Sequence, residues 1–65
     1  MDGVVYRFEL RHADEIIATG HLSPESPLEV GDSITIGRRV GIVRTIEPLL
    51  GEPELRLVVQ LKRDR

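Results

Sequence analysis

The sequence predicts an all-β protein: a single small five-stranded antiparallel barrel, formed as one domain by residues 1–65. Sixteen of the 65 residues are Val, Ile or Thr, against two Ala and one Lys, and this bias favours strands over helices. Several short segments alternate apolar and polar residues, and Gly- or Pro-containing turns separate them at regular intervals. Closure into a barrel would remove the exposed edges of such a sheet.

Composition excludes several classes of protein. The chain has no Cys, a formal net charge of −2 and 40% hydrophobic residues, which is typical of a soluble globular domain. A domain of this size buries only about 60% of the surface that its unfolded chain exposes, so little core is left for an enclosed active site. No segment has the pattern of a signal peptide, and no apolar run reaches the roughly 18 residues of a membrane span. We therefore expect a cytoplasmic location.

The first hairpin is predicted to pair residues 4–10 with residues 15–22. Alternate residues of the first strand are apolar and define its inner face: Val4, Tyr6, Phe8 and Leu10. A three-residue turn, His12-Ala13-Asp14 with Asp in a left-handed conformation, sets the register. It places Leu10 opposite Ile16, Phe8 opposite Ala18 and Tyr6 opposite Gly20. Each aromatic ring then faces a small residue, as a filled inner face requires.

The rest of the chain is predicted to form three strands. Two prolines make residues 23–27 a loop. Residues 33–36 then pair with residues 40–47 across the turn Gly37-Arg38-Arg39, with these partners: Ile36 and Val40, Ile34 and Ile42, Asp32 and Arg44. One 3₁₀ turn fits the segment 48–53. The last strand covers residues 54–62, its inward residues being Leu55, Leu57, Val59 and Leu61, and residues 63–65 are expected to form a frayed tail.

The middle of the chain resembles a known strand pair. Leu28-Glu29-Val30-Gly31-Asp32-Ser33-Ile34-Thr35-Ile36, followed by Val40-Gly41-Ile42-Val43-Arg44-Thr45-Ile46, is similar to the Val-Gly-Asp strand pair of SH3-like and translation-factor-type small barrels. The resemblance covers residues 28–46 and implies an SH3-like fold. It implies no single function, because such barrels occur in ribosomal, elongation-factor, channel and accessory domains alike. The turn at residues 37–39 also lacks the longer glycine-rich loop with which RNA-binding relatives hold phosphate.

The sequence contains no pattern that indicates catalysis, a metal or a cofactor. In the predicted register His12 and His21 lie about 23 Å apart at roughly 3.3 Å per strand residue, too far to share a metal ion. No nucleophile elbow, phosphate-binding loop or zinc-binding helix motif is present, and no Ser has a His nearby in sequence. We therefore expect a protein that is not an enzyme.

Adjacent apolar pairs predict a surface for protein contacts. Four strands carry such a pair, and one member of each should point out of the barrel: Val5, Ile17, Val43 and Val58. Together they would form an apolar patch that binds a partner protein or a second copy. A β-bulge or strong coiling would instead bury both members of a pair. The predicted function is a non-catalytic protein-interaction module or homo-oligomer.

Basic residues support an alternative function, the binding of RNA or DNA. Residues 1–33 carry two Arg and seven acids, a net charge of −5, whereas residues 34–65 carry seven bases and four acids, a net charge of +3. The second half supplies the candidate phosphate contacts: Arg38, Arg39, Arg44 and Arg56, with Lys62 beside them. Both aromatic residues, Tyr6 and Phe8, fall in the inward phase, so bases would have nothing to stack on. A barrel that regulates by binding a small ligand has no residue signature here.

Overall fold

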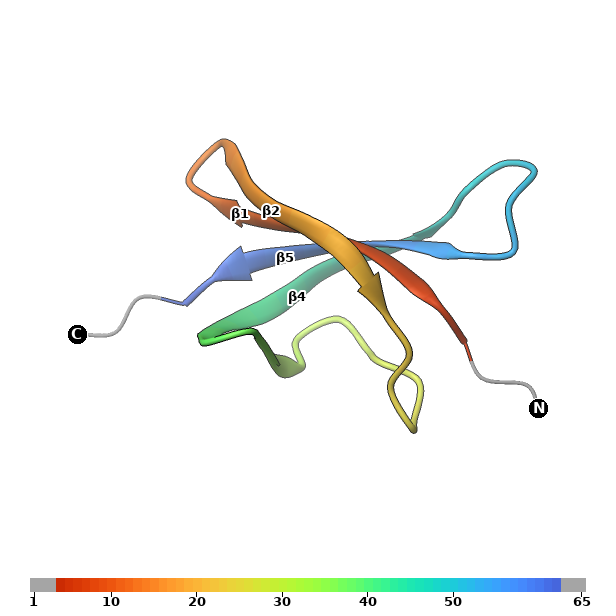
Figure 1. The fold of residues 1–65 in the computed structure, drawn as a ribbon, viewed down its shortest axis with the longest axis horizontal. Coiled ribbons are helices and arrows are strands. Elements are labelled where there is room, and N and C mark those ends of the chain that lie inside the picture. Colours follow the sequence, from red (N-terminus) through yellow and green to blue (C-terminus); the bar gives the residue numbers. More distant parts are fainter. Residues whose placement is uncertain (1–3, 63–65) are drawn as a thin grey trace.

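A computed structural model describes residues 4–62 of the chain, and these residues form five strands and no helix (Figure 1). The strands are β1 (Tyr6–His12), β2 (Glu15–Leu22), β3 (Ser33–Ile36), β4 (Arg39–Pro48) and β5 (Leu55–Leu61). They make one sheet in the order β2-β1-β5-β4-β3. The prediction of a small all-β, five-stranded architecture is confirmed for this part of the chain.

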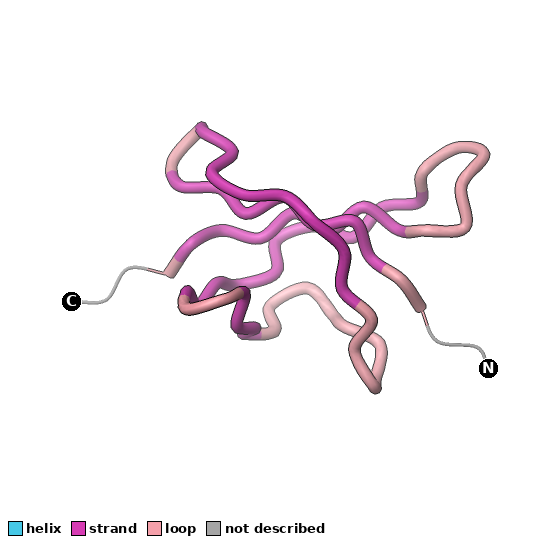
Figure 2. Tube along the Cα trace, in the orientation of Figure 1, coloured by secondary structure: helices cyan, strands magenta, loops and turns pink. Residues whose placement is uncertain are grey.

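The sheet is mixed, so the prediction of a purely antiparallel barrel is wrong. β1 runs parallel to β5, from Tyr6 opposite Leu55 to Arg11 opposite Gln60. The other three neighbouring pairs are antiparallel. The sheet curls into an open half-barrel with β2 and β3 at its two edges (Figure 2). A sheet closes into a barrel only if its two edge strands pair with each other. No pairing between β2 and β3 occurs among residues 4–62.

The core lies on the concave side of this curled sheet. Six apolar side chains are fully or almost fully buried there: Tyr6, Phe8, Leu10, Val43, Leu57 and Val59. They come from β1, β4 and β5, which are the three central strands. The predicted inner faces of the first and last strands are confirmed, because period-two alternation is reliable where one face of a strand is buried. Leu55 and Leu61 at the ends of β5 pack against this core half-buried.

The β1–β2 hairpin closes with a shorter turn than predicted. His12 pairs with Glu15 across the two-residue turn Ala13-Asp14, and Ala13, not Asp14, takes the left-handed conformation, with φ 58°. A bulge follows, because Leu10 pairs with Ala18 while Arg11 pairs with Ile16. The predicted register is therefore off by two residues along most of the strand. A shift of two preserves the face, so the inward phase of β2 holds from Ala18 onward.

The ring of Phe8 leaves no space for a side chain at position 20, which is a glycine. The corrected register places Phe8 opposite Gly20 and Tyr6 opposite Leu22. A Cβ atom on Gly20 would lie 2.9 Å from Cε2 of Phe8, closer than carbon atoms can approach. The expectation that an aromatic residue faces a small one on this hairpin is confirmed for Phe8 and wrong for Tyr6.

The β3–β4 hairpin is also shorter than predicted, and its register changes the face of every residue early in β4. Ile36 pairs with Arg39 across the turn Gly37-Arg38, and Ile34 pairs with Gly41. This one-residue change turns Val43 inward, where it is 1% exposed, so its predicted outward position is wrong. A bulge at Arg44 then reverses the alternation, because Val43 pairs with Val59 while Thr45 pairs with Val58.

A long loop, residues 23–32, connects the two edges of the sheet and crosses its open side. The hydroxyl of Tyr6 accepts a hydrogen bond of 2.9 Å from the backbone N–H of Leu28. At the end of the loop, the N–H of Gly31 donates to the carbonyl of Val43, and the N–H of Val43 donates to the carbonyl of Asp32. The loop is therefore attached to both β1 and β4 although it belongs to neither.

The sequence predicts a 3₁₀ turn before β5 and a frayed tail after it. The segment before β5 forms a hydrogen-bonded turn, in which the N–H of Glu52 donates to the carbonyl of Leu49 and Gly51 has φ 76°. The predicted 3₁₀ turn is absent from this segment, because a positive φ at the third position belongs to a β-turn. The predicted frayed tail, residues 63–65, lies outside the described residues.

Replacement of Gly41 by Ala is expected to destabilise the fold by about 1–3 kcal/mol, because the core there has no space for a methyl group. The added Cβ would overlap Cγ1 of Val59 and lie 3.0 Å from the carbonyl oxygen of Gln60. Urea unfolding measures the loss. Adding Val59→Ala removes the contacting methyl, so the double variant should lose less than the sum of the single losses. Strictly additive losses would contradict the packing explanation.

Replacement of Tyr6 by Phe is expected to cost about 0.5–1.5 kcal/mol, because the N–H of Leu28 loses its acceptor. The ring stays in the core, so the strands should keep their structure. Hydrogen exchange measures the effect, and the N–H of Leu28 should lose far more protection than the amides of β5. Equal loss in both places would mean that the hydroxyl supports the whole core and not the loop in particular.

Candidate functional site

The predicted apolar patch does not form as one surface. Val43 is buried in the core, while Val5 and Val58 are half-buried and Ile17 is 36% exposed. Val5 precedes β1, and its carbonyl accepts a hydrogen bond from the N–H of Leu55. Ile17 lies at the bulge near the start of β2, at the other end of the β1–β2 hairpin from Val5. The residues are therefore spread over both ends of the sheet.

The edge strand β2 carries two neighbouring exposed apolar residues, of which only Ile17 belonged to the predicted patch. Ile16 and Ile17 are 51% and 36% exposed, and they lie where the bulge interrupts the regular pairing of β2. The predicted inward position of Ile16, opposite Leu10, is therefore wrong. The remainder of the strand, residues 18–22, is regular and directs Thr19 and His21 to solvent. β2 has eight residues, whereas β3, the other edge strand, has four. β2 therefore offers the longer unpaired backbone.

Ion pairs occupy the convex face at the junction of β1, β5 and β4. Arg56 binds both oxygens of Glu9, through Nη2 to Oε1 at 3.0 Å and Nε to Oε2 at 3.3 Å, and it also binds Glu47 at 3.1 Å. Arg11 donates to Glu9 at 2.8 Å. Hydrogen bonds from Arg56 and then from Arg11 hold the pKa of Glu9 below its ordinary value. The hydrogen bond of Arg56 to Glu9, and after it the bond to Glu47, raises the pKa of Arg56.

A second group of charges lies next to the first, around the start of β5, where Arg7 is the strand neighbour of Arg56. Arg7 donates to Glu54 at 2.8 Å and approaches Glu52 at 3.4 Å. Nε2 of His21 lies 3.4 Å from the second oxygen of Glu54. Arg7 thus has carboxylate partners within the described chain, as do Arg11 and Arg56.

The five basic residues predicted to contact phosphate are of two kinds: Arg56 forms ion pairs, whereas the other four have no carboxylate partner within residues 4–62. Arg56 is neutralised by Glu9 and Glu47, so it is not available to an external anion. Arg44 lies at the bulge of β4 and has no carboxylate partner among the described residues. The predicted pair with Asp32 does not form, because the true register places Ile42 opposite Ser33. The side-chain oxygen of Asp32 instead accepts a hydrogen bond of 2.8 Å from the N–H of Glu29.

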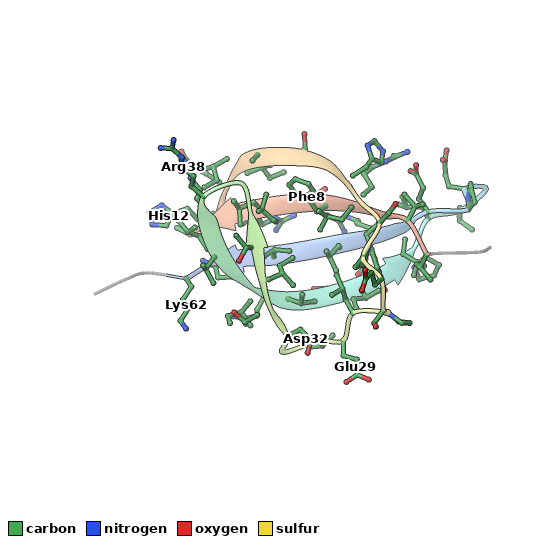
Figure 3. All side chains as sticks on the ribbon, turned by 60° about the horizontal axis from the view of Figure 1, so that its bottom comes forward. Phe8, His12, Glu29, Asp32, Arg38 and Lys62 are labelled. Carbon is green, nitrogen blue, oxygen red and sulfur yellow. The ribbon has the colours of Figure 1, made fainter. Side chains whose placement is uncertain are left out.

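The remaining three basic residues line one hollow. Its volume is about 320 Å³ and its lining consists of Arg38, Arg39, Val40, Leu61 and Lys62. The N–H of Lys62 donates to the carbonyl of Val40 at 2.8 Å, which holds the end of β5 beside the start of β4. Figure 3 shows Arg38 and Lys62, with His12, at the end of the molecule where β1 and β5 finish. Sequence spacing alone did not indicate that Leu61 and Lys62 accompany the Arg-rich turn.

Residues 4–62 contain no group of three His, Cys, Asp or Glu side chains placed to hold a metal ion. No helix long and apolar enough to cross a membrane occurs within that range. No protein-family profile, curated protein or solved structure matches the chain.

Replacement of Glu9 by Gln is expected to weaken the acid-induced loss of stability. The folded-state pKa of Glu9 lies below 4.5, so its charged form stabilises the fold above pH 4.5, and this contribution disappears as the pH falls through the lowered pKa. Urea unfolding at neutral pH and at a pH well below 4.5 measures the difference, which should be smaller in the variant than in the wild type. Glu29→Gln is the control, because Glu29 forms no ion pair among the described residues. If the Glu9 variant lost as much stability on acidification as the wild type, the lowered pKa of Glu9 would not contribute to the acid sensitivity of the fold.

Proposed function

We propose that this domain is a non-catalytic protein-interaction module that forms a homodimer through the open edge of β2. The observation that supports this proposal most directly is that β2, with eight residues, lies at the edge of the sheet, and no other strand within residues 4–62 pairs with its outer side. An unpaired edge presents a row of backbone donors and acceptors that another strand can satisfy.

The two edges differ in how they are protected. β3 is only four residues long, and short edge strands limit pairing. The bulge of β2 protects only the end near Ile16 and Ile17. Residues 18–22 contain no Pro, no Lys and no bulge, so this half of β2 lacks the devices that usually prevent edge pairing.

A second copy fits this half of β2. Opposed residues in antiparallel strands point to the same face. Pairing centred on Gly20 sets Ala18 opposite Leu22 of the second copy and Thr19 opposite His21 of the second copy. Apolar residues of the concave side then meet apolar residues, and polar residues meet polar ones. A core of six buried side chains gains stability from such an added interface.

We also propose that the domain is related to SH3-like barrels and that it is cytoplasmic. The strand pair formed by residues 28–36 and 40–46 supports an SH3-like relationship for this curled sheet, and the domain would act in the cytoplasm. Nucleic-acid binding by the predicted arginines is the weaker alternative, because Arg56 is committed to Glu9 and Glu47. The two aromatic residues, Tyr6 and Phe8, are buried.

Replacement of Thr19 by Lys is expected to convert a dimer of the wild-type protein to a monomer. Lysine on an edge strand opposes pairing, whereas within one copy the introduced side chain would face Glu9 on β1, so the monomer should keep its stability. Sedimentation velocity at micromolar protein concentration measures the state. Thr35→Lys places the same substitution on β3 and should leave the dimer intact. A monomeric wild type, or equal dissociation by both variants, would overturn the proposal.

A further inference from the structure

We infer that the hollow between the β3–β4 turn and the end of β5 is a binding site for an acidic peptide segment of a partner protein. The hollow is lined by Arg38, Arg39, Val40, Leu61 and Lys62. It would be a second surface, separate from the edge of β2, so this inference stands independently of the proposed dimer.

The charge balance of the sheet distinguishes this hollow from the other basic residues. Arg7, Arg11 and Arg56 each lie within 3.0 Å of a carboxylate oxygen. Arg38, Arg39 and Lys62 form no ion pair within residues 4–62, and no acidic side chain of those residues lines the hollow. Three like charges around one hollow repel each other, and an incoming carboxylate would relieve that repulsion with charge-assisted hydrogen bonds.

The size and lining of the hollow favour a short peptide segment. A volume of about 320 Å³ lies at the lower end of the range for small-ligand sites, roughly 300–1,000 Å³. Val40, which is 39% exposed, and Leu61 add an apolar surface between the charges. This combination matches carboxylate side chains that flank one aliphatic residue. The planar fork of Arg38 or Arg39 can bind a carboxylate through two parallel bonds.

The same features argue against a nucleic acid as the occupant. Single-stranded nucleic acids are usually held by exposed aromatic rings as well as by cations, and Tyr6 and Phe8 are 2% and 7% exposed. The net charge of the chain is −2, so the protein as a whole repels an extended polyanion. A peptide with two or three carboxylates requires only the local positive potential of the hollow.

The test is a titration followed by backbone amide NMR. The probe is the acetylated, amidated tetrapeptide Glu-Glu-Leu-Glu, and its Gln-Gln-Leu-Gln counterpart controls for charge. We expect saturable shifts confined to residues 38–40 and 61–62 with the acidic peptide only. The double variant Arg39→Gln with Lys62→Gln should weaken binding at least about tenfold, since two charge-assisted bonds are lost. Arg44→Gln, which removes an exposed arginine outside the hollow, should leave the affinity unchanged.

Three results would overturn the inference. The first is the absence of saturable shifts in a well-dispersed spectrum. The second is an equal loss of binding in Arg44→Gln, which would mean non-specific attraction. The third is tighter binding of a single-stranded oligonucleotide of the same charge, which would assign the hollow to nucleic acid. The oligomeric state is measured on the same samples, so loss of the β2 dimer and loss of peptide binding are distinguished.

Discussion

The parallel pairing of β1 with β5 holds the two parts of the sheet together. It joins the β1–β2 hairpin to the antiparallel unit β3-β4-β5, and it brings the inner face of the first strand against that of the last. Five of the six buried side chains belong to these two strands, so without this pairing there is no core. The contact links residues 49 positions apart, Tyr6 and Leu55, so its formation costs more loop-closure entropy than that of either hairpin. The core is therefore small and non-local.

This pairing also organises the charges. Glu9 on β1 lies on the same convex face as Arg56 on β5, and their bidentate contact spans the parallel junction. Arg11 and Arg56 near the junction are thereby paired with carboxylates, while Arg38, Arg39 and Lys62 have no such partner within residues 4–62. The position of each basic residue along its strand, and so its distance from a carboxylate on the neighbouring strand, thus determines whether it is available to a ligand. The predicted set of four arginines mixed the two kinds, because a one-dimensional charge count cannot separate them.

Sequence reasoning predicted the elements better than their partners. The inward faces of β1 and β5 followed from strict alternation, as did the loop at Pro24 and Pro27 from its two prolines. The predicted registers of both hairpins were wrong, because each hairpin closes with a two-residue turn in place of the predicted three-residue turn. In the β1–β2 hairpin a bulge follows the turn and shifts the register by one further residue. In β4, apolar residues occupy both phases, with Ile42 beside Val43. Alternation cannot choose between them, and the pairing with β3 and β5 selected Val43.

Local patterns in the sequence were sufficient to establish a small all-β domain, its strands and the buried faces of β1 and β5. These properties depend on alternation and on Pro and Gly, which act within a few residues. Three further properties came only from the tertiary structure: β1 runs parallel to β5, the sheet stays open at β2 and β3, and Lys62 joins Arg38 and Arg39. The reason is that strand order and register depend on contacts between distant segments, and several arrangements satisfy the same local pattern.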